Sequence, residues 1–537
     1  MVRKRVVSLF VCLCLLLCCV GCRGEEEGGG FGFSIPAEPK QIDPQTATDT
    51  AALTVIDAVF EGLTRVEDGK AMPAAATWSV SGDGRTYTFT LQESYWSTVS
   101  VRGTKTGFED PVQVTAYDFE FGIRRTADPT TFSPYAALLR GITNADAVLN
   151  GEMPSTELGV KAQNATTLVI TLDAPDDTFL ERLATPAFMP CSRDFFAYTA
   201  GRYGLESKYI LCNGAFYVSG WDHNTSVTLR KNVQYHAQAD ILPTLVKYRV
   251  TKSADEDFEL LKNGYIDAAF VPQAHMDEAT ASGIRLVEMQ DTVEYLWINC
   301  SVETLSNVDI RRALRDAVEW NTLRDNLPQG YTMATGLVPP AATAKGEAYL
   351  HKTLPFTTNA TLAQERLANG LAALELEKMP KLTLLAADDT NSANLARYIA
   401  QSLNKNLSIR CDLDLVDAET LAARVTAGNY QLAIFEKTGR GLTANENLEM
   451  FTSTAPAGNY ARYTDAAYDA LYAAATDDMA SAAALESYLL DTCPALPLGF
   501  SVRYYGLRAD VSGITVTPFD GGIYGAPLSF RQATRAK

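Results

Sequence analysis

Ser402 and Lys405 have the Ser-x-x-Lys spacing in which a lysine can activate a serine nucleophile. Further along the chain, Lys437-Thr438-Gly439 adds a Lys-Thr-Gly motif, a second element of the same chemistry. Taken together, the two motifs would predict covalent catalysis on Ser402.

The spacing between these motifs argues against an enzyme. Only 35 residues separate Ser402 from Lys437, and the Ser-Asp-Asn element that accompanies them in serine enzymes of the penicillin-recognising type is missing. Neither a Gly-x-Ser-x-Gly elbow nor a phosphate-binding loop occurs. We therefore expect no catalysis, and expect Ser402 and Lys405 to be exposed positions near a helix end.

Metal and disulfide chemistry have weak support. The four histidines are scattered without metal-ligand spacing, so we expect no metal and no cofactor. Beyond residue 30 the cysteines are odd in number, and this pattern does not indicate a disulfide-dense scaffold. Cys191 and Cys212 flank one segment and are the candidates for a single disulfide bridge. The alternative, given equal weight, is that both are free thiols.

The N-terminus has the layout of an export signal. Arg3, Lys4 and Arg5 precede an apolar run, Val6–Val20, which is shorter than the about 20 residues of a permanent membrane span. The run ends at Cys19-Val20-Gly21-Cys22, which resembles a bacterial lipobox with Cys19 in the place of the usual leucine. We expect residues 1–21 to be a lipoprotein signal peptide and Cys22 the lipid attachment site; an ordinary cleaved signal is the alternative.

The segment after Cys22 and the overall charge limit the other partners. Residues 22–30 are charged and glycine-rich, which is typical of a flexible tether. The net charge is −18 for the whole chain and becomes −21 when residues 1–21 are removed, because three basic residues are lost with them. A surface this acidic argues against nucleic-acid binding.

The remaining chain predicts an α/β architecture with several domains. About 515 residues exceed the size of a single hydrophobic core. Alternating patterns predict strands at 86–91, 167–172, 226–229 and 381–385, and helical periodicity predicts helices at 310–323, 393–403, 420–426 and 466–474. The helix at 394–403 followed by alternation at 409–415 indicates a partly parallel sheet.

A series of segments, taken in order, resembles the family 5 extracellular solute-binding proteins, the oligopeptide- and dipeptide-binding receptors of ABC transporters. The stretch Pro111-Val112-Gln113-Val114-Thr115-Ala116-Tyr117-Asp118-Phe119 is the most recognisable. Other positions that carry the resemblance include Gln41-Ile42-Asp43-Pro44, Phe60-Glu61-Gly62-Leu63, Arg125 with the following Asp128-Pro129, Ser133-Pro134-Tyr135-Ala136, Asn213-Gly214-Ala215-Phe216-Tyr217 and Asn307-Val308-Asp309-Ile310-Arg311. The resemblance covers nearly the whole mature chain.

This resemblance implies a periplasmic-binding-protein-like type II fold. Two lobes joined by a hinge would close over a solute, with an extra domain inserted in the first lobe. The implied boundaries are 31–58, 186–275 and 500–537 for lobe I, 59–185 for the inserted domain, and 276–499 for lobe II.

The resemblance also implies a ligand pocket. The matched positions are Glu38, Tyr135, Phe270, Arg440, Asn459 and Phe500. After the strand at 431–435, oligopeptide receptors place a tryptophan and an aspartate that binds the peptide's ammonium group, whereas this chain has Lys437 and Arg440 there. A cation cannot pair with an ammonium, so Arg440 predicts a ligand with a free carboxylate; a solvated loop arginine is the equal alternative.

The implied function is capture of peptides or a related small solute, without chemistry of its own. The family resemblance implies a monomer, tethered outside the cytoplasm to the cell membrane, that delivers its solute to an ABC permease and ATPase. A receptor that reports a peptide signal to a sensor is the alternative from another class.

Overall fold

The computed structural model describes residues 29–67, 70–99, 106–176, 178–350, 356–439, 441–455, 458–519 and 528–536. The predicted signal peptide, Cys22, most of the predicted tether and Arg440 lie outside these residues. Within the described ranges, no helix has both the length and the apolar character required to cross a membrane.

Two four-stranded sheets make up one part of the molecule, which we call the two-sheet part. The first has the order β1 (Gly30–Ile35), β10 (Leu245–Val250), β9 (Ser226–Lys231) and β8 (Phe216–Asp222), with β1 parallel to β10. The second has the order β4 (Ala76–Val80), β5 (Thr86–Leu91), β7 (Thr167–Thr171) and β6 (Val160–Asn164).

One continuous hydrophobic core serves both of these sheets. It contains Phe33 from β1, Phe89 from β5 and, from the far end of the chain, Phe530, which contacts the Phe33 ring at 5.0 Å between centroids. The helices of this part are α2 (Thr50–Val59), α3 (Ala116–Ala127), α4 (Ala145–Leu149), α5 (Phe179–Arg182) and α6 (Arg193–Thr199).

A seven-stranded sheet forms the second part, the seven-stranded part. Its order is β11 (Ala268–Val271), β19 (Ala495–Leu507), β12 (Arg285–Ile298), β18 (Leu432–Thr438), β16 (Leu382–Ala387) and β17 (Cys411–Val416), with β13 (Tyr331–Met333) beside β19. Strands β16, β17 and β18 are parallel. The sheet is therefore mixed.

Helices cover both faces of this sheet, and each face has its own core. One core includes residues of α10 (Val308–Ala317), α12 (Ala360–Ala373) and α13 (Thr390–Leu407); the other includes residues of α14 (Ala418–Ala427), α15 (Ala444–Leu448), α16 (Ala466–Ala473) and α17 (Met479–Thr492). The remaining helices are α7 (Ala254–Lys262), α8 (Met276–Ala281), α9 (Glu303–Ser306) and α11 (Trp320–Leu323).

Short strand pairs are β2 (Thr64–Glu67) with β3 (Lys70–Pro73), β14 (Thr343–Ala344) with β15 (Glu347–Ala348), β20 (Val511–Ser512) with β23 (Thr534–Arg535), and β21 (Thr515–Val516) with β22 (Leu528–Ser529).

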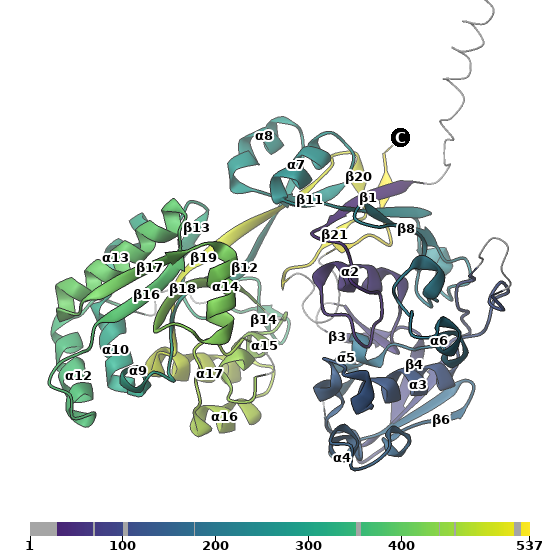
Figure 1. Ribbon diagram of the computed structural model, residues 1–537, viewed down its shortest axis with the longest axis horizontal. Coiled ribbons are helices and arrows are strands. Elements are labelled where there is room, and N and C mark those ends of the chain that lie inside the picture. The colour runs from purple at the N-terminus through teal and green to yellow at the C-terminus, as the bar shows by residue number, and fades with distance from the viewer. Residues whose placement is uncertain are drawn as a thin grey trace, which may run out of the picture.

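The long strands β12 and β19 connect the two parts (Figure 1). At one end, Arg285–Met289 pairs with Arg503–Leu507, and Met289, Tyr505 and Leu507 pack into the core of the two-sheet part. At the other end, β12 pairs with β18. The β12–β19 pairing is irregular between Met289 and Thr292, where these two crossing strands pass from one part of the molecule to the other.

The predicted elements are present, with one interruption. The strands at 86–91 and 226–229 and the helices at 393–403 and 420–426 are confirmed as β5, β9, α13 and α14. The predicted helix at 310–323 is broken after Ala317, because the Thr358 hydroxyl donates to Val318 O (2.8 Å) and accepts from Trp320 N (2.9 Å). A side chain from another segment has therefore replaced the helical backbone bonds there.

The predicted disulfide is wrong. Cys191 and Cys212 are free thiols, both fully buried. Cys191 lies beside Arg125, with 3.9 Å between its Sγ and the arginine Nη1, whereas the Cys212 amide donates to Ser97 Oγ at 3.0 Å. Both thiols lie in the core of the two-sheet part, and burial raises the pKa of each to about 12.

Candidate ligand-binding site

Tyr135 fixes two loops of the two-sheet part to each other. Its hydroxyl donates to Ala47 O, and its amide donates to Ser133 Oγ at 3.2 Å. The Ser133 hydroxyl in turn donates to Gln45 O at 2.6 Å. Because the tyrosine is half-buried, desolvation raises its pKa to about 12, so it is a neutral hydrogen-bonding group near pH 7.

A buried ion pair between Asp43 and Arg125 of α3 joins two of the sequence segments that carry the resemblance. The Arg125 guanidinium contacts both oxygens of Asp43, with 3.0 Å from Nη1 to Oδ1, and also donates to Gln45 Oε1 at 2.8 Å. Its side chain is 10% exposed and that of Asp43 5%. The guanidinium also lies 4.3 Å from the centroid of the Phe196 ring. Nothing in the sequence pairs Asp43 with Arg125, although both lie in segments of the resemblance.

Glu38 uses its carboxylate within the protein. It accepts from Trp221 Nε1 (2.8 Å) and from Asn224 N (2.7 Å), and contacts His223 Nδ1 (2.6 Å). These contacts attach the segment after β1 to the β8–β9 turn.

Phe270 and Phe500 lie in different surroundings. Phe270, in β11, is half-buried, packs edge-on against Tyr505 at 4.7 Å, and has the Arg503 guanidinium 4.8 Å from its centroid. Phe500, in β19, is 3% exposed and belongs to a core of the seven-stranded part. Its side chain therefore supports the sheet from within.

Asn459 holds its own turn together. Its Nδ2 donates to Tyr463 O (2.7 Å) and Thr452 O (3.2 Å), and its Oδ1 accepts from Tyr463 N (2.9 Å). Among the described residues, no hydrogen bond or ring contact joins any two of Glu38, Tyr135, Phe270, Asn459 and Phe500.

Next to Asn459 in sequence, Tyr460 links Lys437 to an aromatic cluster. The Lys437 ammonium lies 5.8 Å from the centroid of Tyr460, and Tyr460 meets both Phe435 and the buried Trp297 edge-on, at 5.8 and 5.3 Å. Phe435, Lys437 and Tyr460 are all partly exposed. The sequence gives a usable signal for this cluster, because Phe435 and Lys437 alternate along a strand and must share one face.

The Ser402 and Lys405 pair is not assembled for catalysis. Ser402 is 3% exposed, so the expectation that it would be exposed is wrong, and its hydroxyl donates to Tyr398 O within α13 at 3.0 Å. Lys405 is exposed, as expected, and pairs with Glu319 at 2.9 Å. The two side chains thus serve the helix and its neighbour.

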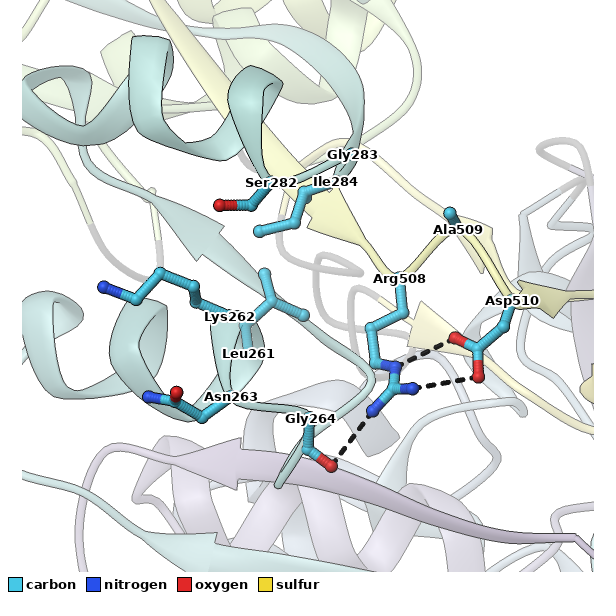
Figure 2. Close-up of a pocket in the computed structure, with 10 residues that line it drawn as sticks. All are labelled: Leu261, Lys262, Asn263, Gly264, Ser282, Gly283, Ile284, Arg508, Ala509 and Asp510. Atoms are coloured by element: carbon cyan, nitrogen blue, oxygen red, sulfur yellow. Dashed lines mark hydrogen bonds and ion pairs between the residues drawn. The ribbon is translucent and has the colours of Figure 1, made fainter.

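One surface pocket is lined by none of these residues. It has a volume of about 410 Å³ and is lined by Leu261, Lys262, Asn263, Gly264, Ser282, Gly283, Ile284, Arg508, Ala509 and Asp510. Figure 2 shows Arg508 held by both oxygens of Asp510 (2.9 Å each) and by Gly264 O (3.1 Å). Within the described part of the chain, no group of three or more histidine, cysteine or acidic side chains is arranged to hold a metal ion.

Glu294 is a buried carboxyl on the opposite face of β12 from Tyr295 and Trp297. It pairs across the strands with Glu436, whose Oε2 accepts from the Tyr331 hydroxyl at 2.7 Å. Burial, and then repulsion from Glu436, raise the pKa of Glu294 well above its ordinary value.

We expect Glu294→Gln to stabilise the protein above neutral pH. Because the pKa is raised in the folded state, unfolding releases the proton once the pH passes the ordinary value, and wild-type stability falls as the pH rises toward the folded value. The variant should have the higher Tm at pH 8, and the difference should vanish toward pH 4. Glu288→Gln, an exposed change on the same strand, is the control and should show no such trend; parallel Tm curves for Glu294→Gln and wild type would contradict the argument.

Comparisons with known proteins agree with this architecture. Residues 70–459 match the family model "Bacterial extracellular solute-binding proteins, family 5 Middle". The chain is 26% identical to the oligopeptide-binding protein OppA of Bacillus subtilis, over 97% of this chain and 98% of that protein, and 26% identical to the dipeptide-binding protein of Lactococcus lactis, over 89% and 88%. It also superposes on the Escherichia coli murein tripeptide binding protein MppA with a TM-score of 0.70 and 25% identity, covering 95% of this chain and 99% of that one. The predicted type II periplasmic-binding fold is confirmed, and the chain belongs to the family 5 bacterial extracellular solute-binding proteins.

Proposed function

We propose that this chain captures peptides, or related small solutes with a free carboxylate, outside the cytoplasm and delivers them to the permease of an ABC importer. A separate ATPase supplies the energy, and the receptor acts as a monomer. The observation that carries this proposal is the family match together with similarity, over almost the full length of both chains, to an oligopeptide-binding protein.

Closure of the two parts around the solute is the mechanism that fits this role. The proposed motion takes place at β12 and β19, where the pairing is already irregular. The proposed lobes follow the predicted boundaries, of which 499/500 falls within β19 itself.

The preference for a carboxylate rests on two cationic residues, Lys437 near the end of β18 and Arg440 just after this strand. Lys437 stands among partly exposed aromatic rings, which offer apolar contact area for a solute. Arg440, three residues later, adds a guanidinium that matches a carboxylate in two-point geometry. We therefore assign the ligand's carboxylate to the neighbourhood of Lys437 and Arg440.

Calorimetry should show that Arg440→Ala weakens peptide binding by about tenfold or more, because one charge-assisted contact is lost. The probes are those members of a synthetic library of short peptides that bind the wild type, each compared with its C-terminally amidated form. Mass spectrometry of solutes that co-purify from the native host identifies the natural ligand. Unchanged affinity in Arg440→Ala, together with equal affinity for the amidated peptides, would overturn the carboxylate assignment.

The membrane attachment is a further part of the proposal. Cys22 carries the lipid, and residues 22–30 form the tether that keeps the receptor near its permease. Cells fed labelled palmitate should incorporate it into the wild type and not into Cys22→Ala. Label that persists in the variant would place the lipid elsewhere.

A further inference from the structure

The C-terminal segment makes a separate connection between the two parts of the molecule. Strands β21 and β22 and the side chains of Ile514 and Phe530 belong to the two-sheet part. Between these strands, Phe519 is 3% exposed and lies in a core of the seven-stranded part, with Val293 and Phe500. Among the described residues of this segment, Phe519 is therefore the aromatic ring that reaches from one part into the core of the other.

Asp291 receives this segment at the irregular point of β12. It is fully buried, and its Oδ2 accepts from the Phe519 amide at 2.9 Å. Arg503 of β19 donates to both oxygens, from Nε at 2.9 Å and from Nη2 at 2.5 Å. The backbone oxygen of Asp291 accepts from Gly439 N at 2.7 Å. One residue thus joins both crossing strands, the C-terminal segment and the end of β18.

Gly439, the last described residue before Arg440, is enclosed by these groups. A Cβ at this position would lie 2.5 Å from the Phe519 ring and 2.2 Å from Asn447 Oδ1. Asn447 is 4% exposed and donates to Gly441 O (2.8 Å) and Thr443 O (2.7 Å). The described residues on either side of position 440 are therefore both held, Gly439 by Phe519 and Asp291, and Gly441 by Asn447.

We propose that Phe519 and Asp291 are positioning residues for ligand recognition, because they fix the β18–α15 segment from the C-terminal end of the chain. The position of the β18–α15 segment would then depend on the contact that Phe519 makes between the two-sheet part and the seven-stranded part. The same contact would therefore bias closure of the two parts. The role in recognition rests on the proposed function; the fixing of the segment does not.

Hydrogen exchange without any added peptide tests the fixing of the segment. In Phe519→Ala, amides in a fragment spanning 436–448 should exchange about tenfold faster than in the wild type, with amides of α10 unchanged. Phe356→Ala, which removes a buried ring on the opposite face of the same sheet, is the matched control and should leave that fragment as in the wild type. Unchanged exchange of the fragment in folded Phe519→Ala would overturn the proposal.

Two further variants and one binding measurement complete the test. Phe519→Leu and Asp291→Asn replace Phe519→Ala if that variant does not fold, and the same acceleration is expected of them. Library peptides that bind the wild type should bind the variants about tenfold more weakly, and equal affinity would overturn the role in recognition. If no peptide binds the wild type, the proposed function fails, while the exchange result still decides whether Phe519 and Asp291 hold the segment.

Discussion

Replacing Arg125 with methionine should lower the free energy of unfolding by about 3–5 kcal/mol, the usual effect of leaving one buried ion without its partner. Asp43 would lose its counter-ion in a site that is 5% exposed, where the Gln45 amide still donates to its Oδ1 at 3.1 Å. The methionine fills most of the volume beside Phe196, so lost packing adds little. Urea unfolding followed by circular dichroism measures the change.

Two controls separate the charge effect from packing. The double variant Arg125→Met with Asp43→Asn removes both charges and should recover a large share of the loss, since no uncompensated ion remains. Lys208→Met breaks an exposed pair with Glu206 and should change nothing measurable. A double variant as unstable as the single one would show that the ion pair is not the cause.

Gly122→Ala should destabilise the protein by about 3 kcal/mol, although alanine is the better helix former by about 1 kcal/mol. Gly122 lies inside α3, and a Cβ there would stand 2.3 Å from Met189 O, a backbone atom that cannot rotate away. Either the helix or the segment carrying Cys191 must move. Thermal unfolding of the variant should show a Tm several degrees lower than that of the wild type.

Gly82→Ala is the matched control for this prediction. No atom stands within 4 Å of a Cβ at Gly82, so the same substitution should shift the stability by no more than about 0.5 kcal/mol. A Gly122→Ala variant as stable as Gly82→Ala would mean that α3 is not packed directly against the backbone at 189–191.

Local periodicity predicted much of the fold because it reports which side of an element is buried. Strand β5 and helix α13 appear where their patterns place them. The pattern could not predict the interruption at Val318, because its cause is Thr358, a side chain 40 residues away in sequence. It also could not predict the burial of Ser402, because α10 and α12, which pack against α13, come from other segments of the chain.

The candidate site was predictable only in outline. The resemblance proposes Glu38 and Asn459 as site residues, but that the Glu38 carboxylate already accepts from Trp221 and the Asn459 Oδ1 from Tyr463 depends on three-dimensional contacts. The candidate disulfide is absent for a related reason, since proximity in sequence does not by itself pair two buried thiols. By contrast, strand alternation places Phe435 on the face of Lys437 and could have been used to predict that pair, although not Tyr460 or Trp297.

The first and last described strands of the chain meet in one core, and this constrains the order of folding. Phe33 packs against Phe530, and Arg535 Nη2 donates to Gly30 O at 3.1 Å. Under the proposed export, the N-terminal end of the chain crosses the membrane first, so β1 would cross before the segment that carries Phe530 and Arg535. The core of the two-sheet part would then be complete only after that C-terminal segment had crossed.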